Sequence, residues 1–279
     1  MIIPSRWFSG GKGLDGFRKE MLTDKHVRHI VDFENFRDAF PGVDVAGGVC
    51  YFLWDRDNSG TCTVTNVFGK ESFTAERQLD EFPTFIRSSR SVAIVKKVVE
   101  SHGKQSTFLD SRVSPSKPFG LRGFYVPKLE GIPCWFVQKV GKKFASPTDV
   151  CDEHQLLNHW KLLIPKAPIA GQTDFSRPVR FYYDENTRIA APGECCTETY
   201  LVACAFESKE EVESFKTYLY TKITRFLLLQ TVISQDVTRK NFAFVPDLGL
   251  YKGVYTDETL CDQWGITADE WKYIDSKIG

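Results

Sequence analysis

The sequence predicts a two-part protein: an α/β segment that is one piece of a larger sheet, followed by an α+β region. The first 66 residues alternate strand-like and helix-like runs, which is typical of α/β chains. They supply too few parallel strands for a complete doubly wound sheet. The remaining residues mix short strand-like runs with capped amphipathic stretches. The length of 279 residues fits one large domain or two modest ones.

In the first part, the pattern predicts a helix in which Leu14, Phe17 and Met21 share one face, and strands over 1–3, 27–33, 48–54 and 61–68. The run 48–54 is continuously apolar, which is typical of a strand buried on both faces. The turn-forming residues 55–60 separate it from 61–68. We therefore expect 61–68 to be an antiparallel return strand.

In the second part, apolar spacing predicts a helix within 84–99, a loop at 111–127, and strands over 134–140, 160–164, 198–206 and 241–245. Ser208 with Glu211 forms a capping box, and the helix after it is expected to bury apolar residues as far as Leu227. Thr267 with Glu270 forms a second capping box, which opens a terminal helix.

Charge is distributed unevenly along the chain. The 36 basic and 36 acidic residues cancel, which excludes binding driven by net charge but not a local basic patch. Residues 112–143 hold seven basic residues and one acid, whereas residues 247–275 hold seven acids and two lysines. This pattern fits a polyanion groove with an acidic face behind it, and it fits two solvated faces equally well. The basic candidates for DNA contact are Lys117, Arg122, Lys139, Lys142 and Lys143.

Composition also bounds the setting of the protein. No apolar run reaches the length of a membrane span, and the first residues lack a signal-peptide pattern, so we expect a cytoplasmic protein with no membrane partner. None of the eight cysteines makes a C-x-x-C pair, which favours reduced, buried thiols. His26 with His29, or Cys151 with His154, has metal-ligand spacing but no further ligands nearby, so no metal is expected.

Residues 11–16, Gly-Lys-Gly-Leu-Asp-Gly, match the dinucleotide pattern G-x-G-x-x-G, and Asp32 and Glu34 lie where a ribose-binding acid belongs. In that fold the first glycine ends the strand directly, so that the backbone can reach the pyrophosphate. Residues 4–10 intervene here. A glycine-rich connection is therefore the favoured interpretation, and a nucleotide-binding enzyme is the alternative.

Several motifs resemble the late motifs of adenine-N6 DNA methyltransferases of the gamma-ordered class, found in type II and type IIG restriction–modification systems. Near the N-terminus these are Ile-Ile-Pro-Ser-Arg-Trp-Phe at 2–8, Ile-Val-Asp-Phe at 30–33, Phe-Pro-Gly-Val at 40–43 and 47–54. Near the C-terminus they are 196–201, 221–227, 235–239, 244–246 and 256–260. The resemblance covers nearly the whole chain and is specific at 1–54 and 196–274.

The resemblance implies a fold and a partner. Residues 1–76 would be the end of a Rossmann-like methyltransferase sheet, and residues 77–279 an α+β target recognition domain that binds double-stranded DNA. The chain departs from the class because it has neither the catalytic Asn-Pro-Pro-Tyr nor the acidic and glycine-rich loop for S-adenosylmethionine. We therefore expect that the chain is not catalytic alone, and that the cofactor belongs to the complete enzyme.

The resemblance also implies site residues. In this class a Phe in a Phe-Pro loop stacks on the extruded adenine, and Phe40 in the loop 38–42 matches it; a core Phe is the alternative. Gln235, Thr238, Arg239 and Lys240 are expected to form a second DNA-contact loop, because Gln pairs with adenine and Arg with guanine. A polar turn in which Asp236 fixes Arg239 is the alternative.

Three functions are compatible with these sequence features. The first is a DNA-recognition module attached to the tail of a methyltransferase fold. The second is a nucleotide-binding enzyme that uses the Gly11–Gly16 loop. The third is a non-catalytic subunit that completes a split methyltransferase by joining a separate N-terminal half.

Overall fold

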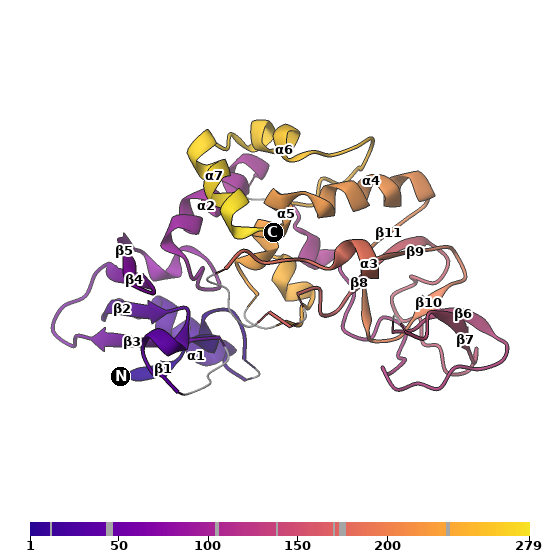
Figure 1. Ribbon diagram of the computed structural model, residues 1–279, viewed down its shortest axis with the longest axis horizontal. Coiled ribbons are helices and arrows are strands. Elements are labelled where there is room, and N and C mark those ends of the chain that lie inside the picture. The colour runs from indigo at the N-terminus through magenta and orange to yellow at the C-terminus, as the bar shows by residue number, and fades with distance from the viewer. Residues whose placement is uncertain are drawn as a thin grey trace.

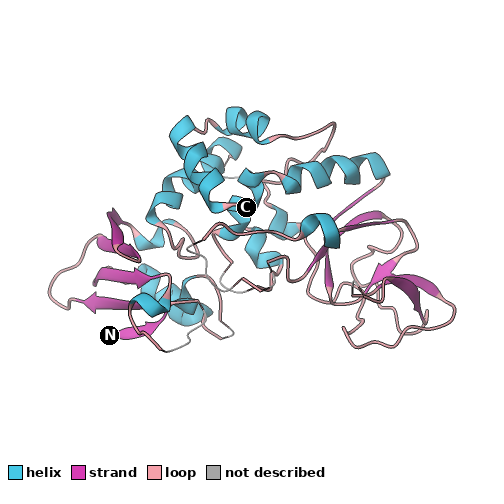
Figure 2. Cartoon of the chain, viewed as in Figure 1, coloured by secondary structure: helices cyan, strands magenta, loops and turns pink. Residues whose placement is uncertain are grey.

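The computed structural model describes residues 1–11, 13–42, 47–103, 106–137, 139–169, 171–172, 177–232 and 235–279. It is a mixed α/β structure. Lys12 of the glycine-rich motif, residues 43–46 after the Phe-Pro loop, and Gln138 lie outside the described residues. Figure 1 shows helices gathered along one side, with two strand-rich units at opposite ends beneath them, and Figure 2 shows the same division by secondary structure.

The N-terminal unit is a five-stranded sheet of order β1-β3-β2-β4-β5. Its elements are β1 (Ile2–Pro4), α1 (Asp15–Thr23), β2 (Val27–Phe33), β3 (Val49–Trp54), β4 (Cys62–Phe68) and β5 (Glu71–Arg77). Met21 and Leu22 of α1 pack with Ile30 and Cys50 of the sheet in a core that also includes Trp7. The predicted strand and helix positions in this part are therefore confirmed.

Two expectations about this sheet are wrong. β3 is not buried on both faces, because Tyr51 is 43% exposed and Leu53 52% exposed, while Cys50 on the opposite face is buried. The helix α1 packs against only one face, and successive strand residues point to opposite faces. β4 does not return beside β3, because β1 and β2 already occupy both edges of β3. β4 pairs in parallel with β2 and antiparallel with β5.

The other strand-rich unit has sheet order β10-β6-β7, with β6 (Ile132–Trp135), β7 (Lys142–Ala145) and β10 (Cys195–Cys196). The single strand expected over 134–140 is wrong, because the chain turns there. The carbonyl of Val137 accepts hydrogen bonds from the amides of Val140 (2.8 Å) and Gly141 (3.1 Å), and Gly141 has φ +71°. That turn makes β6 and β7 an antiparallel hairpin.

Between the two units lies a third sheet of order β11-β8-β9, covered by helices. Its strands are β8 (Trp160–Pro165), β9 (Arg188–Ala190) and β11 (Tyr200–Phe206). The helices of this part are α2 (Ser89–His102), α3 (Tyr183–Asn186), α4 (Lys209–Tyr220), α5 (Lys222–Leu229), α6 (Asp257–Trp264) and α7 (Ala268–Lys277). The strands predicted at 160–164 and 198–206 and the helix starts at Ser208 and Thr267 are confirmed.

Three boundaries in this part differ from expectation. The helix after Ser208 breaks at Thr221, whose side chain accepts a hydrogen bond from the amide of Thr224 and caps α5. The helix predicted from residue 84 begins at Ser89, where the side chain of Asn66 accepts the Ser89 amide (3.0 Å). The strand expected over 241–245 is absent, because Asn241 and Thr238 form a capping box around the 3₁₀ turn Arg239–Phe242. Each difference comes from a side chain that satisfies a free backbone amide.

Candidate nucleic-acid interface

The glycine-rich loop is a folded connection. Arg18 of α1 reaches back over the loop and donates to the carbonyl of Trp7 (2.7 Å) and to the carbonyl of Gly10. Asp15 stands in the first turn of α1, where a pyrophosphate would have to bind. Its hydrogen bond to Arg18 and the nearby charge of Lys240 lower the pKa of Asp15. A carboxylate held in its charged form at this position opposes the binding of a second anion.

Asp32, the acid that a dinucleotide site would need for the ribose, is engaged elsewhere. Its buried carboxylate accepts from Nε (2.6 Å) and a terminal nitrogen (2.9 Å) of Arg87, and from the hydroxyl of Ser5 (2.9 Å). Burial opposes the charge of Arg87, but the carboxylate of Asp32 outweighs burial and raises the pKa of Arg87. Asp32 is therefore held in a structural ion pair and is not available to a ribose.

Phe40 stands in a loop and not in the sheet core. The short turn Phe36–Asp38 precedes it, and its amide donates to the carbonyl of Phe36 (2.8 Å). The carboxylate of Asp38 accepts the amide of Gly69 (2.9 Å), which fixes the turn to the β4–β5 connection. The side chain of Phe40 is 39% exposed. Its place thus allows contact with a partner, and its role in base stacking stays a prediction.

The five basic candidates of the middle region are all exposed, but their charges are not equally available. Lys142 pairs with Glu194 and lies 5.4 Å from the ring of Trp135, and Arg122 lies 3.9 Å from Glu198. In the described part of the chain, Lys117, Lys139 and Lys143 have no ion pair. Lys142 and Lys143 are neighbours on β7, so their side chains point to opposite faces of the hairpin. The structure does not bring these two together on one surface.

The predicted contact loop at 235–240 is held to the rest of the protein by a buried side chain and by hydrogen bonds. Val237 is buried, and its amide donates to the carbonyl of Lys166 (2.8 Å). Asn241 accepts the amide of Thr238 (2.7 Å) and donates to the carbonyl of Thr231 (2.8 Å). Thr238 therefore has a capping role.

The exposed members of this loop are Gln235, Asp236, Arg239 and Lys240. Lys240 lies 3.5 Å from Asp15 of α1. Burial raises the pKa of Asp110, and the backbone amide of Ser111 and, to a smaller extent, the positive charge of Arg239 oppose that rise. The long side chains of the loop thus stand on a rigid base, as a base-reading loop requires.

This loop separates two hollows, which we call together the central groove. One hollow, of about 450 Å³, is lined by Gly11, Gly13 and Asp15 on one side and by Thr238 and Lys240 on the other. The second, of about 500 Å³, is lined by Gly123, Val137, Lys166 and Glu198. Asp236 lines both hollows. The central groove therefore runs from the glycine-rich loop, past the predicted contact loop, to the strand-rich unit that carries the basic stretch.

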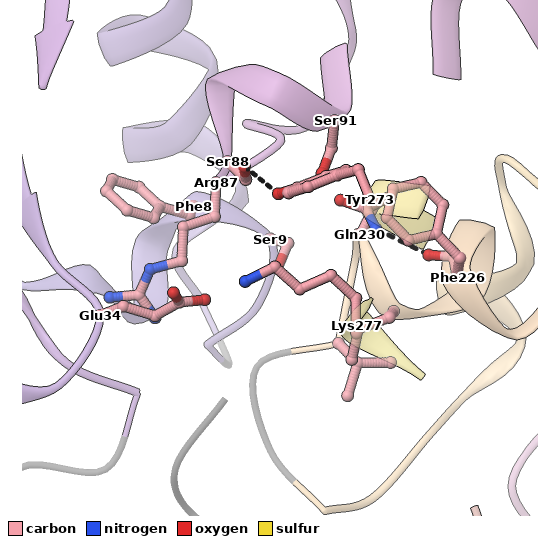
Figure 3. A pocket seen from close by; sticks show the side chains of 12 residues that line it. Phe8, Ser9, Glu34, Arg87, Ser88, Ser91, Phe226, Gln230, Tyr273 and Lys277 are labelled. Carbon is pink, nitrogen blue, oxygen red and sulfur yellow. Dashed lines mark hydrogen bonds between the residues drawn. The ribbon is translucent and has the colours of Figure 1, made fainter. Parts of the chain in front are cut away.

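A separate cavity of about 60 Å³ lies where the N-terminal unit meets the helices (Figure 3). Arg87 and Ser9 line it from one side, and Gln230, Tyr273 and Lys277 from the other. The hydroxyls of Ser88 and Tyr273 form a hydrogen bond across this seam (2.7 Å). Because this hydrogen bond joins residues on its two sides, the cavity marks the contact between the two parts.

Comparisons with known proteins agree with the sequence motifs. Residues 1–40 match the Eco57I restriction-modification methylase family. An uncharacterized adenine-specific methylase of Mycoplasma pneumoniae (strain ATCC 29342 / M129 / Subtype 1) is 29% identical over 77 residues, which is 27% of this chain and 18% of that protein. The predicted resemblance to restriction–modification adenine methylases is confirmed.

A solved structure, the type IIG restriction endonuclease BpuSI, aligns with 95% of this chain and 41% of its own chain, at 10% sequence identity and a TM-score of 0.31. The chain thus covers less than half of BpuSI and less than a fifth of the curated methylase. In the described residues, no helix is long and apolar enough to cross a membrane. No group of three or more metal-ligating side chains occurs within that same part.

Sequence reasoning missed several residues of the central groove. Gly123 and Val137 line it although neither has a chemical signature. Outside the groove, the ion pair of Arg87 with Asp32 was also missed, because the two lie 55 residues apart. The loop chemistry of 111–127 was the available signal for Gly123. No local pattern points to Val137, because its place depends on the turn between β6 and β7.

Proposed function

We propose that this chain recognises double-stranded DNA in a sequence-specific manner, as part of an adenine-N6 DNA methyltransferase of a restriction–modification system. The observation that carries the proposal is the position of the loop 235–240. It stands in the middle of the central groove, with Asp236 lining both hollows, next to a unit with the exposed lysines Lys117, Lys139 and Lys143. Gln235 and Arg239 are exposed on the same loop, whose Asp236, Thr238 and Lys240 line the groove. Polar side chains beside a groove flanked by cations suit a nucleic acid.

The proposal divides the chain as the resemblance implies. Residues 1–76 would be the end of the catalytic sheet, and residues 77–279 the target recognition domain. The glycine-rich loop does not suit the phosphates of a nucleotide-type cofactor, since Arg18 binds its Gly10 carbonyl and the carboxylate of Asp15 stands in the first helical turn. S-adenosylmethionine and the catalytic motif would therefore be supplied by the complete enzyme, and this chain alone would not transfer a methyl group.

The partner proposed for the N-terminal unit is the other half of the methyltransferase. The sheet leaves Tyr51 and Leu53 on an exposed face, beside the exposed Ile2 of β1. Exposed apolar side chains grouped on one sheet face mark a site of interaction. The same exposed face supports the second candidate function, a non-catalytic subunit that completes a split enzyme. Binding of a separately produced catalytic half, lost on Leu53→Asp, would favour this second function.

Arg239→Ala is expected to lower the affinity and the sequence preference for duplex DNA without lowering the melting temperature. The reason is that Arg239 is exposed, and a good bidentate contact to guanine is worth about 1–3 kcal/mol. Asn241→Ala is the matched control, since it removes the hydrogen bonds to Thr238 and Thr231 and should lower the melting temperature. If Arg239→Ala lowers the melting temperature as much as Asn241→Ala does, the loop is a structural turn.

Lys143→Ala is expected to reduce the salt dependence of DNA binding by roughly one unit in the log–log slope, as for one lost phosphate contact. Lys142→Ala should change the slope less, because Glu194 already neutralises Lys142. The slope is measured by titrating labelled duplex at several salt concentrations. An unchanged slope in Lys143→Ala would place the phosphate contacts elsewhere.

Phe40→Ala, in an enzyme reconstituted with its catalytic half, is expected to weaken capture of the extruded adenine by roughly ten- to a hundredfold, since base stacking on an aromatic ring is worth about 1–3 kcal/mol. Fluorescence of 2-aminopurine at the target position measures this capture. The melting temperature should hold, because the ring is partly exposed. Wild-type capture by Phe40→Ala would remove the stacking role.

A further inference from the structure

The segment 122–130 presents apolar side chains to solvent. Phe124 is 82% exposed, Val126 70% and Leu129 99%. Arg122 and Lys128 are interleaved with them and are also exposed. Removing such surface from water is favourable, so a fixed group of exposed apolar side chains marks a site of interaction.

Hydrogen bonds hold this segment in place at both ends and in the middle. The amide of Gly123 donates to Glu198 (2.9 Å), and the amide of Lys128 donates to the carbonyl of Phe144 on β7 (2.9 Å). Between them, the hydroxyl of Tyr125 donates to Asp149 (2.7 Å), and its ring stacks on Phe136. Because these contacts fix Tyr125 against the protein, they also fix the neighbouring Phe124 in its exposed position.

The segment adjoins the central groove. Gly123 and Glu198 both line the second hollow, and Phe124 directly follows Gly123. The bridge between Lys128 and Phe144 ties the other end to β7, which carries Lys143. Phe124 is thus the residue next to the groove lining, in a segment that also carries Arg122 and Lys128.

This combination suits DNA. Proteins that bend or open a duplex insert an apolar wedge between bases while cations hold the flanking phosphates. Lys128 supplies positive charge within the segment, where Arg122 lies 3.9 Å from Glu198. Lys139 and Lys143 follow the segment in the chain and are exposed. A protein partner or a lipid surface could also bind the apolar side chains. Neither would explain why these side chains directly adjoin the central groove.

We propose that Phe124 is a wedge that inserts between neighbouring bases of the DNA bound in the central groove and unstacks that step. The inference rests on the proposed function, because it requires duplex DNA in the groove. It adds a role in opening the duplex, distinct from base reading by Gln235 and Arg239 and from base stacking by Phe40. Val126 and Leu129 would cover the apolar edges of the opened step.

The test uses the full 279-residue chain and short duplexes that carry 2-aminopurine, whose fluorescence rises when it is unstacked. The duplexes are of mixed sequence, either fully paired or with one mismatch, because a mismatched base costs less to unstack. The unaltered protein should raise the fluorescence and favour the mismatched duplexes. Phe124→Ala should lose both effects and bind the mismatched duplexes roughly tenfold or more weakly, with an unchanged salt slope.

Two further variants sharpen the result. Phe124→Trp keeps a stacking ring and should restore the fluorescence change. Val254→Ala, at a 75% exposed apolar residue in the acidic region, should behave as the unaltered protein does. A normal fluorescence change in Phe124→Ala would overturn the wedge alone. Failure of the unaltered protein to bind any duplex would overturn the proposed function with it, as would Phe124-dependent binding to lipid vesicles only.

Discussion

Asp32→Asn is expected to lower the free energy of unfolding by about 3–5 kcal/mol, because it leaves a buried positive charge without its partner. The side chain of Asp32 is 1% exposed and that of Arg87 17%. Arg87 also donates to the carbonyls of Gly47 (2.9 Å) and Phe33 (3.0 Å), so it cannot turn outward without breaking several bonds. Chemical denaturation with urea measures the effect.

The control for Asp32→Asn is Asp80→Asn. Asp80 pairs with Lys25 at 2.6 Å, but both side chains are about two-fifths exposed, and such surface pairs contribute at most about 1 kcal/mol. The double variant Asp32→Asn with Arg87→Met should be more stable than Asp32→Asn alone, since it removes the stranded charge. Equal, small losses in Asp32→Asn and Asp80→Asn would contradict the assigned role of the buried pair.

The second large effect is a pH dependence that originates at Lys161. This lysine is fully buried, and its Nζ donates to the carbonyls of Leu157 (3.0 Å), His159 (2.7 Å) and Ala191 (3.2 Å). Burial lowers the pKa of Lys161 from 10.5 to about 8. In the folded protein this lysine therefore loses its proton at a lower pH than in the unfolded chain.

The sign of the effect follows from proton binding. Between pH of about 8 and 10.5 the unfolded chain binds more protons at this site than the folded protein, so the contribution of Lys161 to the free energy of unfolding rises with pH. The pKa difference corresponds to roughly 3 kcal/mol over the whole range. Lys161→Met should lack this rise when unfolding is measured across these pH values, whereas Lys252→Met, at an exposed lysine, should keep it. Parallel curves for Lys161→Met and the unaltered protein would contradict the assignment.

Local signals in the sequence predicted elements well, whereas long-range pairing was out of reach. The cap at Thr267 and the apolar face of α1 each depend on residues that are close in the sequence, and both helices form as expected. The pairing of β4 with β2 depends on which strand edges are free, and the turn after Trp135 separates a run that looks like one strand. The break at Thr221 depends on a hydroxyl that caps its own chain.

The same division holds for the candidate site. The loop 235–240 was predicted to be polar and well supported, and its exposed Arg239 and Lys240 agree with that. Its approach to Asp15 joins residues 225 positions apart, which no local pattern records. The ion pair of Lys142 with Glu194 likewise depends on the parallel pairing of β6 with β10. In the folded protein, Glu194 therefore neutralises one of the positive charges of the basic stretch.

The central claim, that duplex DNA occupies the central groove, is tested most directly by mapping the lysines that bound DNA protects from chemical acetylation. Each lysine is followed by mass spectrometry with and without DNA. Lys117, Lys139, Lys143 and Lys240 should be protected, while Lys252 and Lys272 in the acidic region should react equally in both samples. Protection of Lys252 and Lys272, with none at Lys143 and Lys240, would contradict the claim.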